Sequence, residues 1–404
     1  MGQDSPVVRA HSALAGGGEL ITHDACRSCG GDFMPVLDLG MHPLPDFGKK
    51  SPVWSYAPLN LVQCVDCLLV QLKHTVDREK LFSNYWYRSG MSETMRAALL
   101  EVARKAKPFL YDGAVSLDIG SNDGTLMSLM RGECVGFEPS SIGEGTDAIH
   151  DYFNAPRYFD LGIPSAEVIT SIAMFYSVGE PEQFVSDIAA VLAADGVWIN
   201  QMNDLTAMVE NNAYDIIGHE HTCVWSLEAL DPLLARHGLE VFRVERIDPN
   251  GGSIRIYAQH KGTRPVEASV LQQRAIEAKL NVAKFGDHVR EATAKLHDMA
   301  RRIQRDGQRL YIYGASTRGV TIVHAAQLDE VLVSAAAERD ESKVGMLFPG
   351  TRIPIVSERD AHIAAPDYFL ALPYSYLPQF QKRESQWLKW GGRFIVPVPE
   401  PRVI

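Results

Sequence analysis

Apolar runs alternate with helix-like segments through the middle of the chain. An apolar run at 114–119 leads through a glycine-containing turn into a helix-like segment at 125–131, and a second apolar run at 134–137 ends at Glu138. Short apolar runs bounded by turn residues are typical of buried strands. The order strand, tight turn, helix, strand and acid predicts half of a mononucleotide-binding unit.

The same alternation continues after Glu138. Apolar runs at 166–172 and 196–202 flank a helical pattern around 182–192. This repetition predicts an α/β fold with a doubly wound, Rossmann-like sheet. Because ligands bind at the carboxyl ends of the strands in such sheets, we expect residues 173–176 and Asn203 near a ligand.

The carboxyl-terminal third repeats the pattern after a long helix. Residues 267–305 are helical by pattern, and steps of three and four give one apolar stripe, made of Val282, Phe285, Val289, Ala292, Leu296, Met299 and Ile303. Packing of this helix on its own domain is favoured over a coiled-coil dimer, because three heptads are marginal alone. A strand at 309–313 then leads into a glycine turn at 314–319, and a second strand ends at Glu338, which predicts a second Rossmann-like unit.

Length and charge limit the classes of function. A chain of 404 residues exceeds the usual size of one hydrophobic core, so we expect two or three domains. The net charge of −11, without basic runs, argues against a nucleic-acid partner. No apolar run is long enough to span a bilayer, and residues 1–20 lack the apolar run of a signal peptide, so they predict a flexible tail. We therefore expect a cytoplasmic protein, and the pattern is compatible with a monomer.

Four of the six cysteines form two matched pairs, Cys26-x-x-Cys29 and Cys64-x-x-Cys67. Each pair can present two thiolates from a tight knuckle to one tetrahedral ion. Two disulfides are disfavoured because cytoplasmic cysteines stay reduced, and a redox pair is disfavoured because there are two matched pairs. The pattern predicts a structural Zn²⁺ site without a catalytic role, since four thiolates leave no open coordination position.

The turn Asp118-Ile-Gly-Ser-Asn-Asp-Gly124 carries the clearest chemical signal. Its spacing is not the Gly-x-Gly-x-x-Gly of pyrophosphate sites, and no lysine or arginine stands nearby to balance phosphate charge. Asp118, Asp123 and Glu138 favour a cation, and Glu138 can accept both hydroxyls of a ribose. These features indicate S-adenosylmethionine, a cationic sulfonium with a ribose; an ordinary βα turn is the alternative. The residues expected at this site are Asp118, Gly120, Ser121, Asn122, Asp123, Gly124, Glu138, Pro139, Ala173, Met174, Phe175 and Asn203.

A second chemical signal is the sequence His219-Glu-His221. Zinc binding on a helix needs histidines four apart, so the spacing does not fit a metalloprotease motif. In an extended segment His219 and His221 would share a face and Glu220 would point the other way. One histidine could then act as a base, while Glu220 orients a neighbour or contacts a substrate hydroxyl. Polar residues on a solvated loop are the alternative.

An aromatic segment, Tyr85-Trp-Tyr87, lies between the cysteine module and the first glycine turn. It is compatible with a hydrophobic seam that joins the modules. It is equally compatible with a lid that faces a substrate.

The order of several motifs resembles the deoxysugar C3-methyltransferases of antibiotic pathways. These motifs are the cysteine knuckles, Tyr-x-Tyr-x-Ser-Gly, Asp-x-Gly-Ser-Asn-Asp-Gly, Gly-Phe-Glu-Pro, His-Glu-His and Asn250-Gly-Gly-Ser-Ile-Arg255. Beyond residue 305, four more sequences resemble that family's carboxyl-terminal domain: Tyr313-Gly-Ala-Ser-Thr-Arg-Gly319, Glu338-Arg-Asp340, Phe348-Pro-Gly-Thr-Arg-Ile-Pro354 and Gly391-Gly-Arg-Phe-Ile-Val-Pro397. The resemblance covers roughly residues 24–400.

The resemblance implies transfer of a methyl group from S-adenosylmethionine to C3 of a dTDP-linked 4-keto-deoxysugar. It implies that His221 is the base, with Glu220 and His219 in the same site, and that Tyr85 and Tyr87 border the sugar. It places the nucleotide end of the sugar on the carboxyl-terminal unit, with expected contacts at Ser316, Arg318, Glu338, Arg339, Tyr374 and Ser375.

The sequence patterns and the resemblance together divide the chain into four parts. These are a tail (1–20), a zinc-binding module (21–80), a methyltransferase domain (81–262) and a carboxyl-terminal Rossmann-like domain (263–404).

Two positions depart from the family's pattern. Gly218 stands where the family commonly has tyrosine, and Glu180 stands where it tends to have histidine. The first change removes a phenol that could hydrogen-bond the keto oxygen, and the second changes the local charge. One hypothesis is that NADPH is a second cofactor and the 4-ketone is also reduced. Another is a scaffold that binds sugar nucleotide without catalysis, against which the intact turn at 118–124 counts.

Overall fold

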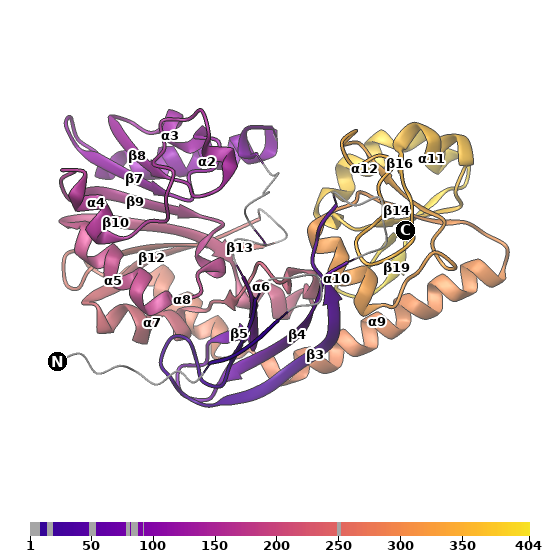
Figure 1. The fold of residues 1–404 in the computed structure, drawn as a ribbon, viewed down its shortest axis with the longest axis horizontal. Coiled ribbons are helices and arrows are strands. Elements are labelled where there is room, and N and C mark those ends of the chain that lie inside the picture. Colours follow the sequence, from indigo (N-terminus) through magenta and orange to yellow (C-terminus); the bar gives the residue numbers. More distant parts are fainter. Residues whose placement is uncertain are drawn as a thin grey trace.

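The computed structural model describes residues 9–13, 19–47, 54–77, 81, 88–91, 93–248 and 252–404. Figure 1 shows two α/β halves, one from the middle of the chain and one from its carboxyl-terminal third, with the amino-terminal strands below and between them. The expected α/β fold with Rossmann-like sheets and a small cysteine-containing module is confirmed.

The amino-terminal module consists of antiparallel strands: β1 (Arg9–Ala13), β2 (Glu19–His23), β3 (Phe33–Pro43), β4 (Tyr56–Cys64), β5 (Val70–Leu72) and β6 (His74–Val76). The first sheet has the order β1-β2-β6. The second has the order β11-β5-β4-β3, and its edge strand β11 (Cys223–Val224) comes from the middle of the chain. The sequence predicts a flexible tail over 1–20, whereas the structure pairs residues 9–13 with β2.

The central half is one mixed sheet with helices on it. Its strands are β7 (Val115–Ile119), β8 (Glu133–Phe137), β9 (Ala166–Ile172), β10 (Leu192–Asn203), β12 (Leu239–Ile247) and β13 (Ser253–His260). Its helices are α2 (Glu93–Ala106), α3 (Thr125–Leu129), α4 (Ala155–Asp160), α5 (Pro181–Val191), α6 (Leu205–Glu210), α7 (Leu227–Arg236) and α8 (Ala268–Glu277).

The strand order of this sheet, β12-β13-β10-β9-β7-β8, creates a switch point. From β7 the chain crosses to β8 on one side and then to β9 on the other, and all three strands are parallel. Such a point opens a crevice outside the carboxyl ends of β7 and β9, where ligands bind. The antiparallel strand β13 lies between β12 and β10.

Helix α8 lies with the central half, beyond the expected boundary at 262. The Glu277 carboxylate accepts a hydrogen bond from Leu227 N at the start of α7 (3.0 Å), and Gln273 Nε2 donates to the Thr206 hydroxyl of α6 (3.1 Å). The carboxyl-terminal half therefore begins with the next helix.

The carboxyl-terminal half begins with the long helix α9 (Val282–Arg305). Its strands are β14 (Leu310–Tyr313), β15 (Ala335–Glu338), β16 (Ile355–Ser357), β17 (Tyr368–Ala371), β18 (Arg393–Val396) and β19 (Arg402–Val403). Its other helices are α10 (Thr317–Ala325), α11 (Glu358–Ala364), α12 (Leu377–Arg383) and α13 (Ser385–Lys389). The order β16-β15-β14-β17-β18-β19 places a second switch point between β14 and β17.

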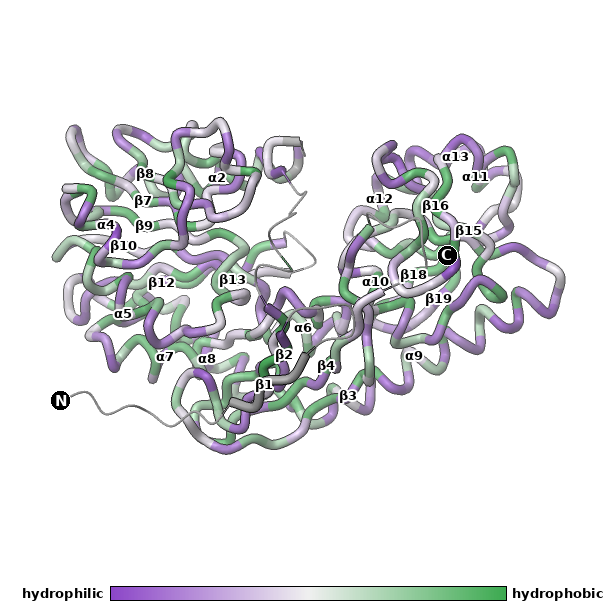
Figure 2. The backbone as a smooth tube through the Cα atoms, viewed as in Figure 1, coloured by the Kyte–Doolittle hydropathy of each residue, from purple (hydrophilic) through white to green (hydrophobic). Residues whose placement is uncertain are grey.

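The hydrophobic cores follow the pattern expected from the sequence. Figure 2 shows hydrophobic residues concentrated along the inner strands of both halves and alternating with hydrophilic residues along α9. The predicted stripe of α9 packs within the chain, with Val289 and Leu296 fully buried, so the intramolecular packing of this helix is confirmed. A Cβ atom added at Gly286 would stand 2.2 Å from Val36 O, so α9 also lies directly against β3. No helix among the described residues has the length and hydropathy needed to cross a membrane.

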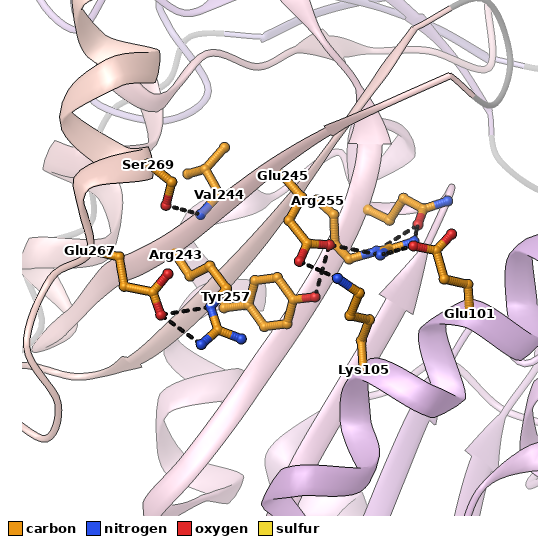
Figure 3. Close-up of polar contacts among 10 residues, drawn as sticks. Glu101, Lys105, Arg243, Val244, Glu245, Arg255, Tyr257, Glu267 and Ser269 are labelled. Atoms are coloured by element: carbon orange, nitrogen blue, oxygen red, sulfur yellow. Dashed lines mark hydrogen bonds and ion pairs between the residues drawn. The ribbon is translucent and has the colours of Figure 1, made fainter.

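A polar network fastens α2 to the edge of the central sheet (Figure 3). Arg255 of β13 is fully buried, and its guanidinium donates to Glu245 Oε2 (2.9 Å) and to Gln201 Oε1 (3.0 Å). Lys105 of α2 donates to the other Glu245 oxygen (2.6 Å). The arginine of the Asn250–Arg255 motif is thus structural, since a buried charge is tolerated only when it is paired and hydrogen-bonded.

Candidate active site

A cleft of about 1740 Å³ separates the two halves, and all three parts of the chain line it. The switch point of the central sheet contributes Gly120 and Ala173, and that of the carboxyl-terminal sheet contributes Gly314 and Pro373. The crevices at both switch points therefore open into one space, with His221 among the lining residues.

The first glycine turn forms a cradle whose acid is held by backbone groups. Gly120 has a φ of 73°, a conformation that favours glycine, and an added Cβ would stand 3.3 Å from Met174 Cγ. Glu138 Oε2 accepts from Asn122 N (2.9 Å), and Oε1 accepts from Ser140 N (2.9 Å) and from the Ser140 hydroxyl (2.6 Å). The carboxylate is fixed at the cleft wall, and three of its four lone-pair sites are occupied, so Oε2 can accept from one ribose hydroxyl but not from both, contrary to the expectation from the sequence.

Asp118 lies under this turn and is 3% exposed. Its burial raises the pKa of the carboxyl to about 7. The hydrogen bond that Thr170 donates to Oδ1 (2.7 Å) lowers this pKa, and the negative charge of Glu138 raises it. The end of the cleft at Asp118, Gly120 and Glu138 thus presents carboxyl groups and a backbone that a ligand can approach closely. Among the described residues, neither Asp118 nor Glu138 forms an ion pair. An acidic, glycine-cradled crevice fits a cationic nucleoside such as S-adenosylmethionine.

Nine of the expected donor-site residues line the cleft: Asp118, Gly120, Ser121, Asn122, Glu138, Pro139, Ala173, Met174 and Asn203. Three do not. Asp123 accepts from Gly90 N (2.8 Å) and from the Thr125 hydroxyl (2.6 Å), and Gly124 precedes α3 with a φ of 75°. Phe175 is fully buried and stacks on Trp225 with ring centroids 4.9 Å apart, so it belongs to the core.

His221 is oriented by the backbone of a preceding segment. Its Nδ1 lies 2.6 Å from Ile216 O; because a carbonyl oxygen only accepts, the neutral ring carries its proton on Nδ1 and leaves a lone pair on Nε2. Burial lowers the pKa of His221, the nearby Arg318 acts in the same direction, and Glu220 opposes both. The Tyr176 ring lies edge-on at 4.4 Å between centroids. Such a histidine is neutral near pH 7 and suited to act as a base.

The expected extended conformation of His219–His221 is wrong. His221 N donates to Gly218 O (2.9 Å), which makes a turn and places the two histidines on different sides. His219 is 3% exposed and its Nε2 lies 3.3 Å from His42 O of β3, away from the cleft. Glu220 does line the cleft, and its backbone oxygen accepts from the Ser177 hydroxyl (2.6 Å).

The two sequence departures have different structural settings. Glu180 is exposed at the start of α5 and is absent from the cleft lining, so its charge does not enter the site. A Cβ added at Gly218 would stand 3.0 Å from Glu220 Oε2, so a tyrosine there would displace this carboxylate. Tyr85 and Tyr87 lie outside the described residues.

A buried ion pair joins the two halves beside His221. Arg318 Nη2 of α10 lies 2.6 Å from Asp215 Oδ2, and the Tyr374 hydroxyl donates to Asp215 Oδ1 (3.0 Å). The resemblance implies that Arg318 contacts the nucleotide end of the sugar, and the structure pairs its guanidinium with Asp215. Tyr176 lies in the segment 173–176 that the sequence places near a ligand. Asp215 is a cleft residue that the sequence motifs miss, because its bond to Tyr374 spans 159 positions and leaves no local pattern.

The carboxyl-terminal switch point repeats the layout of the donor turn. Glu338 ends β15, and its Oε2 accepts from Ala315 N (2.7 Å), much as Glu138 accepts from Asn122 N. Lys343 Nζ donates to Ala315 O (2.9 Å) and lies 4.6 Å from the Phe47 ring centroid, at the mouth of the glycine turn. The expected residues Ser316, Arg318, Glu338, Arg339, Tyr374 and Ser375 all line the cleft.

The four predicted metal ligands come together. The Sγ atoms of Cys26, Cys29, Cys64 and Cys67 lie within 4.8 Å of one another, and the Cys26–Cys67 and Cys29–Cys64 separations are 3.6 and 3.4 Å. A tetrahedral Zn²⁺ with bonds of about 2.3 Å needs sulfurs about 3.8 Å apart, so the set fits zinc. Ser28 O accepts from Arg236 of α7 (2.6 Å), which ties this knuckle to the central half.

Three family models match successive parts of the chain. They describe a zinc binding domain (26–82), a methyltransferase domain (87–244) and a C-methyltransferase C-terminal domain (248–399). None of the three describes a reductase, so the hypothesis of a second cofactor, NADPH, has no support from them.

A curated relative matches over nearly the whole chain. The C-methyltransferase NovU of Streptomyces niveus is 30% identical over 410 aligned positions, which cover 94% of this chain and 97% of that protein. Among solved structures, a S-adenosylmethionine-dependent methyltransferase from Anabaena variabilis is 11% identical, with a TM-score of 0.34, and covers 42% of this chain and 86% of its own. A methyltransferase bound to its Trm112 activator from Haloferax volcanii has a TM-score of 0.32 at 13% identity and covers 42% of this chain and 94% of its own.

Proposed function

We propose a substrate for this chain, which belongs to the family of S-adenosylmethionine-dependent C-methyltransferases. It methylates C3 of a nucleotide-linked 4-keto-deoxysugar, with dTDP as the nucleotide. The observation that carries this proposal is the single cleft into which two nucleotide-type switch points open, with a neutral histidine between them. One crevice suits the methyl donor, and the second suits the nucleotide of the acceptor.

The donor crevice has the charge and shape for S-adenosylmethionine. This group supplies an electrophilic methyl on a positively charged sulfur. Glu138 Oε2 would accept from one ribose hydroxyl while Asn122 N and Ser140 N hold the carboxylate in place. Gly120 would let the backbone approach the adenosine, the Met174 side chain packs beside it, and Asp118 lies beneath the turn.

The acceptor crevice has groups for a sugar nucleotide. Glu338 stands where a strand-end acid meets a nucleoside sugar, and Lys343 offers a cation beside the glycine turn for a diphosphate. Ser316 caps α10 by accepting from Gly319 N (3.1 Å). With the nucleotide in this crevice, the attached sugar would extend toward His221.

His221 is the group proposed to remove the C3 proton. A proton on a carbon beside a ketone is acidic enough for an imidazole, and Nε2 carries the lone pair because Nδ1 donates to Ile216 O. Glu220 would contact a sugar hydroxyl, and Tyr176 would keep the imidazole ring in place through its edge-on contact.

Mass spectrometry of the sugar nucleotide tests this proposal. The enzyme is incubated with methyl-labelled S-adenosylmethionine and a dTDP-4-keto-2,6-dideoxysugar, and the expected product carries one labelled methyl on carbon. The matched control is the same sugar nucleotide with C4 reduced to a hydroxyl, which has no acidic C3 proton and should remain unmethylated. Unchanged keto sugar, or equal methylation of both compounds, would refute the proposed substrate.

A further inference from the structure

Besides the base, the proposed reaction requires a group that stabilises negative charge on the oxygen of the substrate. When the C3 proton leaves, negative charge moves to the oxygen on C4, and a positioned donor or cation at that oxygen lowers the barrier. The phenol common at position 218 in the resembling family is absent, because Gly218 has no side chain. The oxygen must therefore meet another group close to His221.

Arg318 is the cleft cation that is tied to the segment orienting His221. The cations that line the cleft within the described ranges are Arg88, Arg318, Arg339, Lys343 and Arg383. Lys343 bonds Ala315 O at the nucleotide turn, and Arg383 bonds the Tyr313 hydroxyl and Glu358. Of the five, Arg318 is paired with Asp215, one residue before the Ile216 carbonyl that orients His221.

The segment 215–217 holds the base and this cation in a fixed relation. Asp215 is 2% exposed and pairs with Arg318 at 2.6 Å, while Ile216 O accepts from His221 Nδ1 at 2.6 Å. Ile217 O accepts from the Thr321 hydroxyl at 2.6 Å, which fastens helix α10, the element that carries Arg318. Three successive residues thus anchor the arginine, the histidine and the helix between them.

We propose that the Arg318 guanidinium binds the carbonyl oxygen of the substrate and holds the negative charge that develops there when His221 removes the neighbouring proton. This inference rests on the proposed function. A guanidinium carries five N–H groups, so Arg318 can bind a ligand oxygen while it stays paired with Asp215. Its side chain is 23% exposed, and Arg318 is one of the residues that line the cleft. The carboxyl-terminal half then contributes a catalytic residue as well as a nucleotide crevice.

The step balances as follows. His221 Nε2 takes the C3 proton, and the electrons of the C3–H bond form a C3–C4 double bond while the carbonyl π electrons move to the oxygen beside Arg318. C3 then bonds to the methyl carbon as the carbonyl re-forms, and the electron pair of the broken sulfur–methyl bond stays on sulfur. His221 returns its proton to water, and Arg318 keeps its protons throughout.

Exchange of the C3 proton measures this role separately from methyl transfer. In D₂O, with S-adenosylhomocysteine bound in the donor crevice, wild type should incorporate deuterium at C3 of a dTDP-4-keto-2,6-dideoxysugar. Arg318→Gln should slow both exchange and kcat by about 10²- to 10³-fold, as expected for loss of one oxyanion donor. The exchange rate and kcat of Arg318→Lys should lie between those of wild type and Arg318→Gln, because lysine keeps the positive charge without the planar guanidinium. Arg359→Gln, an exposed arginine of the same half, should match wild type.

The outcomes separate this inference from the function beneath it. If wild type neither exchanges nor methylates the keto sugar, the proposed substrate is wrong. If wild type does both and folded Arg318→Gln exchanges at the wild-type rate, only the role of Arg318 is wrong. Because Arg318→Gln leaves a buried carboxylate behind, the double variant Arg318→Gln/Asp215→Asn removes both charges and retains the test if the single variant does not fold. Wild-type exchange in that double variant would overturn the proposal.

Discussion

The Nδ1 atom of His221 lies 2.6 Å from the backbone oxygen of Ile216, and this contact decides which ring nitrogen, Nε2, can take a proton. The carbonyl fixes the tautomer, and the turn at Gly218 directs the ring to the cleft while His219 goes to the other side. Because the partner of Nδ1 is a backbone oxygen, the tautomer of His221 does not depend on a neighbouring side chain. Its chemical role can therefore be tested by changing the ring alone.

Replacement His221→Asn should abolish methyl transfer and leave the donor crevice intact. Asparagine cannot accept the proton at neutral pH, and loss of a positioned base typically costs 10²- to 10⁴-fold. Initial rates of methyl transfer and calorimetric titration of S-adenosylmethionine measure the two effects. His288→Asn, at an exposed histidine of α9, is the control that should match wild type. Full activity of His221→Asn would remove the base assignment.

Much of the donor crevice can be predicted because its signal is local. Gly120, Asn122 and Glu138 belong to one strand-turn-helix-strand unit, in which glycine spacing and a strand-end acid determine the geometry. Phe175 fails for an equally local reason. The chain turns after Ala173, which has a φ of 57°, and the next aromatic side chain packs into the core instead of the cleft. Side-chain direction at a strand end depends on a turn that sequence spacing does not specify.

The contacts between the halves could not be predicted from sequence patterns. The Asp215–Arg318 pair and the Tyr374–Asp215 bond depend on how α10 lies against the segment 214–217. Arg318 by itself suggests a phosphate ligand, and only its partner shows that it stands beside the base. The β11 strand is a similar case, because two residues carry too little pattern to reveal that they extend the sheet of the zinc module.

Replacement Glu138→Gln should weaken binding of S-adenosylmethionine. The amide cannot accept hydrogen bonds at both of its ends, so either Asn122 N or the Ser140 groups would face an N–H donor and the ribose would lose a charged acceptor. Hydrogen bonds to a charged group contribute roughly 1.5–3 kcal/mol, which corresponds to a dissociation constant about 10- to 100-fold higher. Calorimetric titration provides the measurement. Glu133→Gln, at the exposed start of the same strand, should bind normally, and equal affinity in both variants would contradict the ribose role.

Loss of the zinc site should lower the activity, because the zinc module and the segment that follows His221 share the sheet β11-β5-β4-β3. The replacement Cys26→Ser removes one thiolate from the cluster, so zinc content should fall and the amino-terminal module should melt at a lower temperature. Because β5 pairs with β11, only two residues after His221, kcat should decrease as well. Metal analysis, thermal melting and initial rates provide the three measurements. Cys134→Ser, at a cysteine outside the cluster, should keep its zinc; a metal-free Cys26→Ser enzyme with full activity and stability would show that the site is dispensable.

Low pH should lower the free energy of unfolding, because it favours protonation of His42, which is buried where the three parts of the chain meet. This histidine of β3 is 2% exposed, its ring lies 5.7 Å from that of His324 on α10, and its backbone oxygen meets His219 Nε2 at 3.3 Å. Burial, and then the neighbouring His324 and His219, lower the pKa of His42 from 6.5 to about 3. The folded state thus excludes a proton that the unfolded chain binds below pH 6.5.

The stability contributed by neutral His42 is complete above pH 6.5 and is lost as the pH falls toward 3. For one group the free energy of unfolding should decrease by about 1.4 kcal/mol per pH unit within that window. Urea denaturation of wild type and of His42→Phe at pH 7, 6 and 5 measures this slope. The phenylalanine ring fills the same space without titrating. The free energy of unfolding of His42→Phe should therefore change with pH by about 1.4 kcal/mol per pH unit less than that of wild type. Equal slopes would mean that the acid sensitivity comes from other groups, such as His219 or His324, whose pKa values burial also lowers.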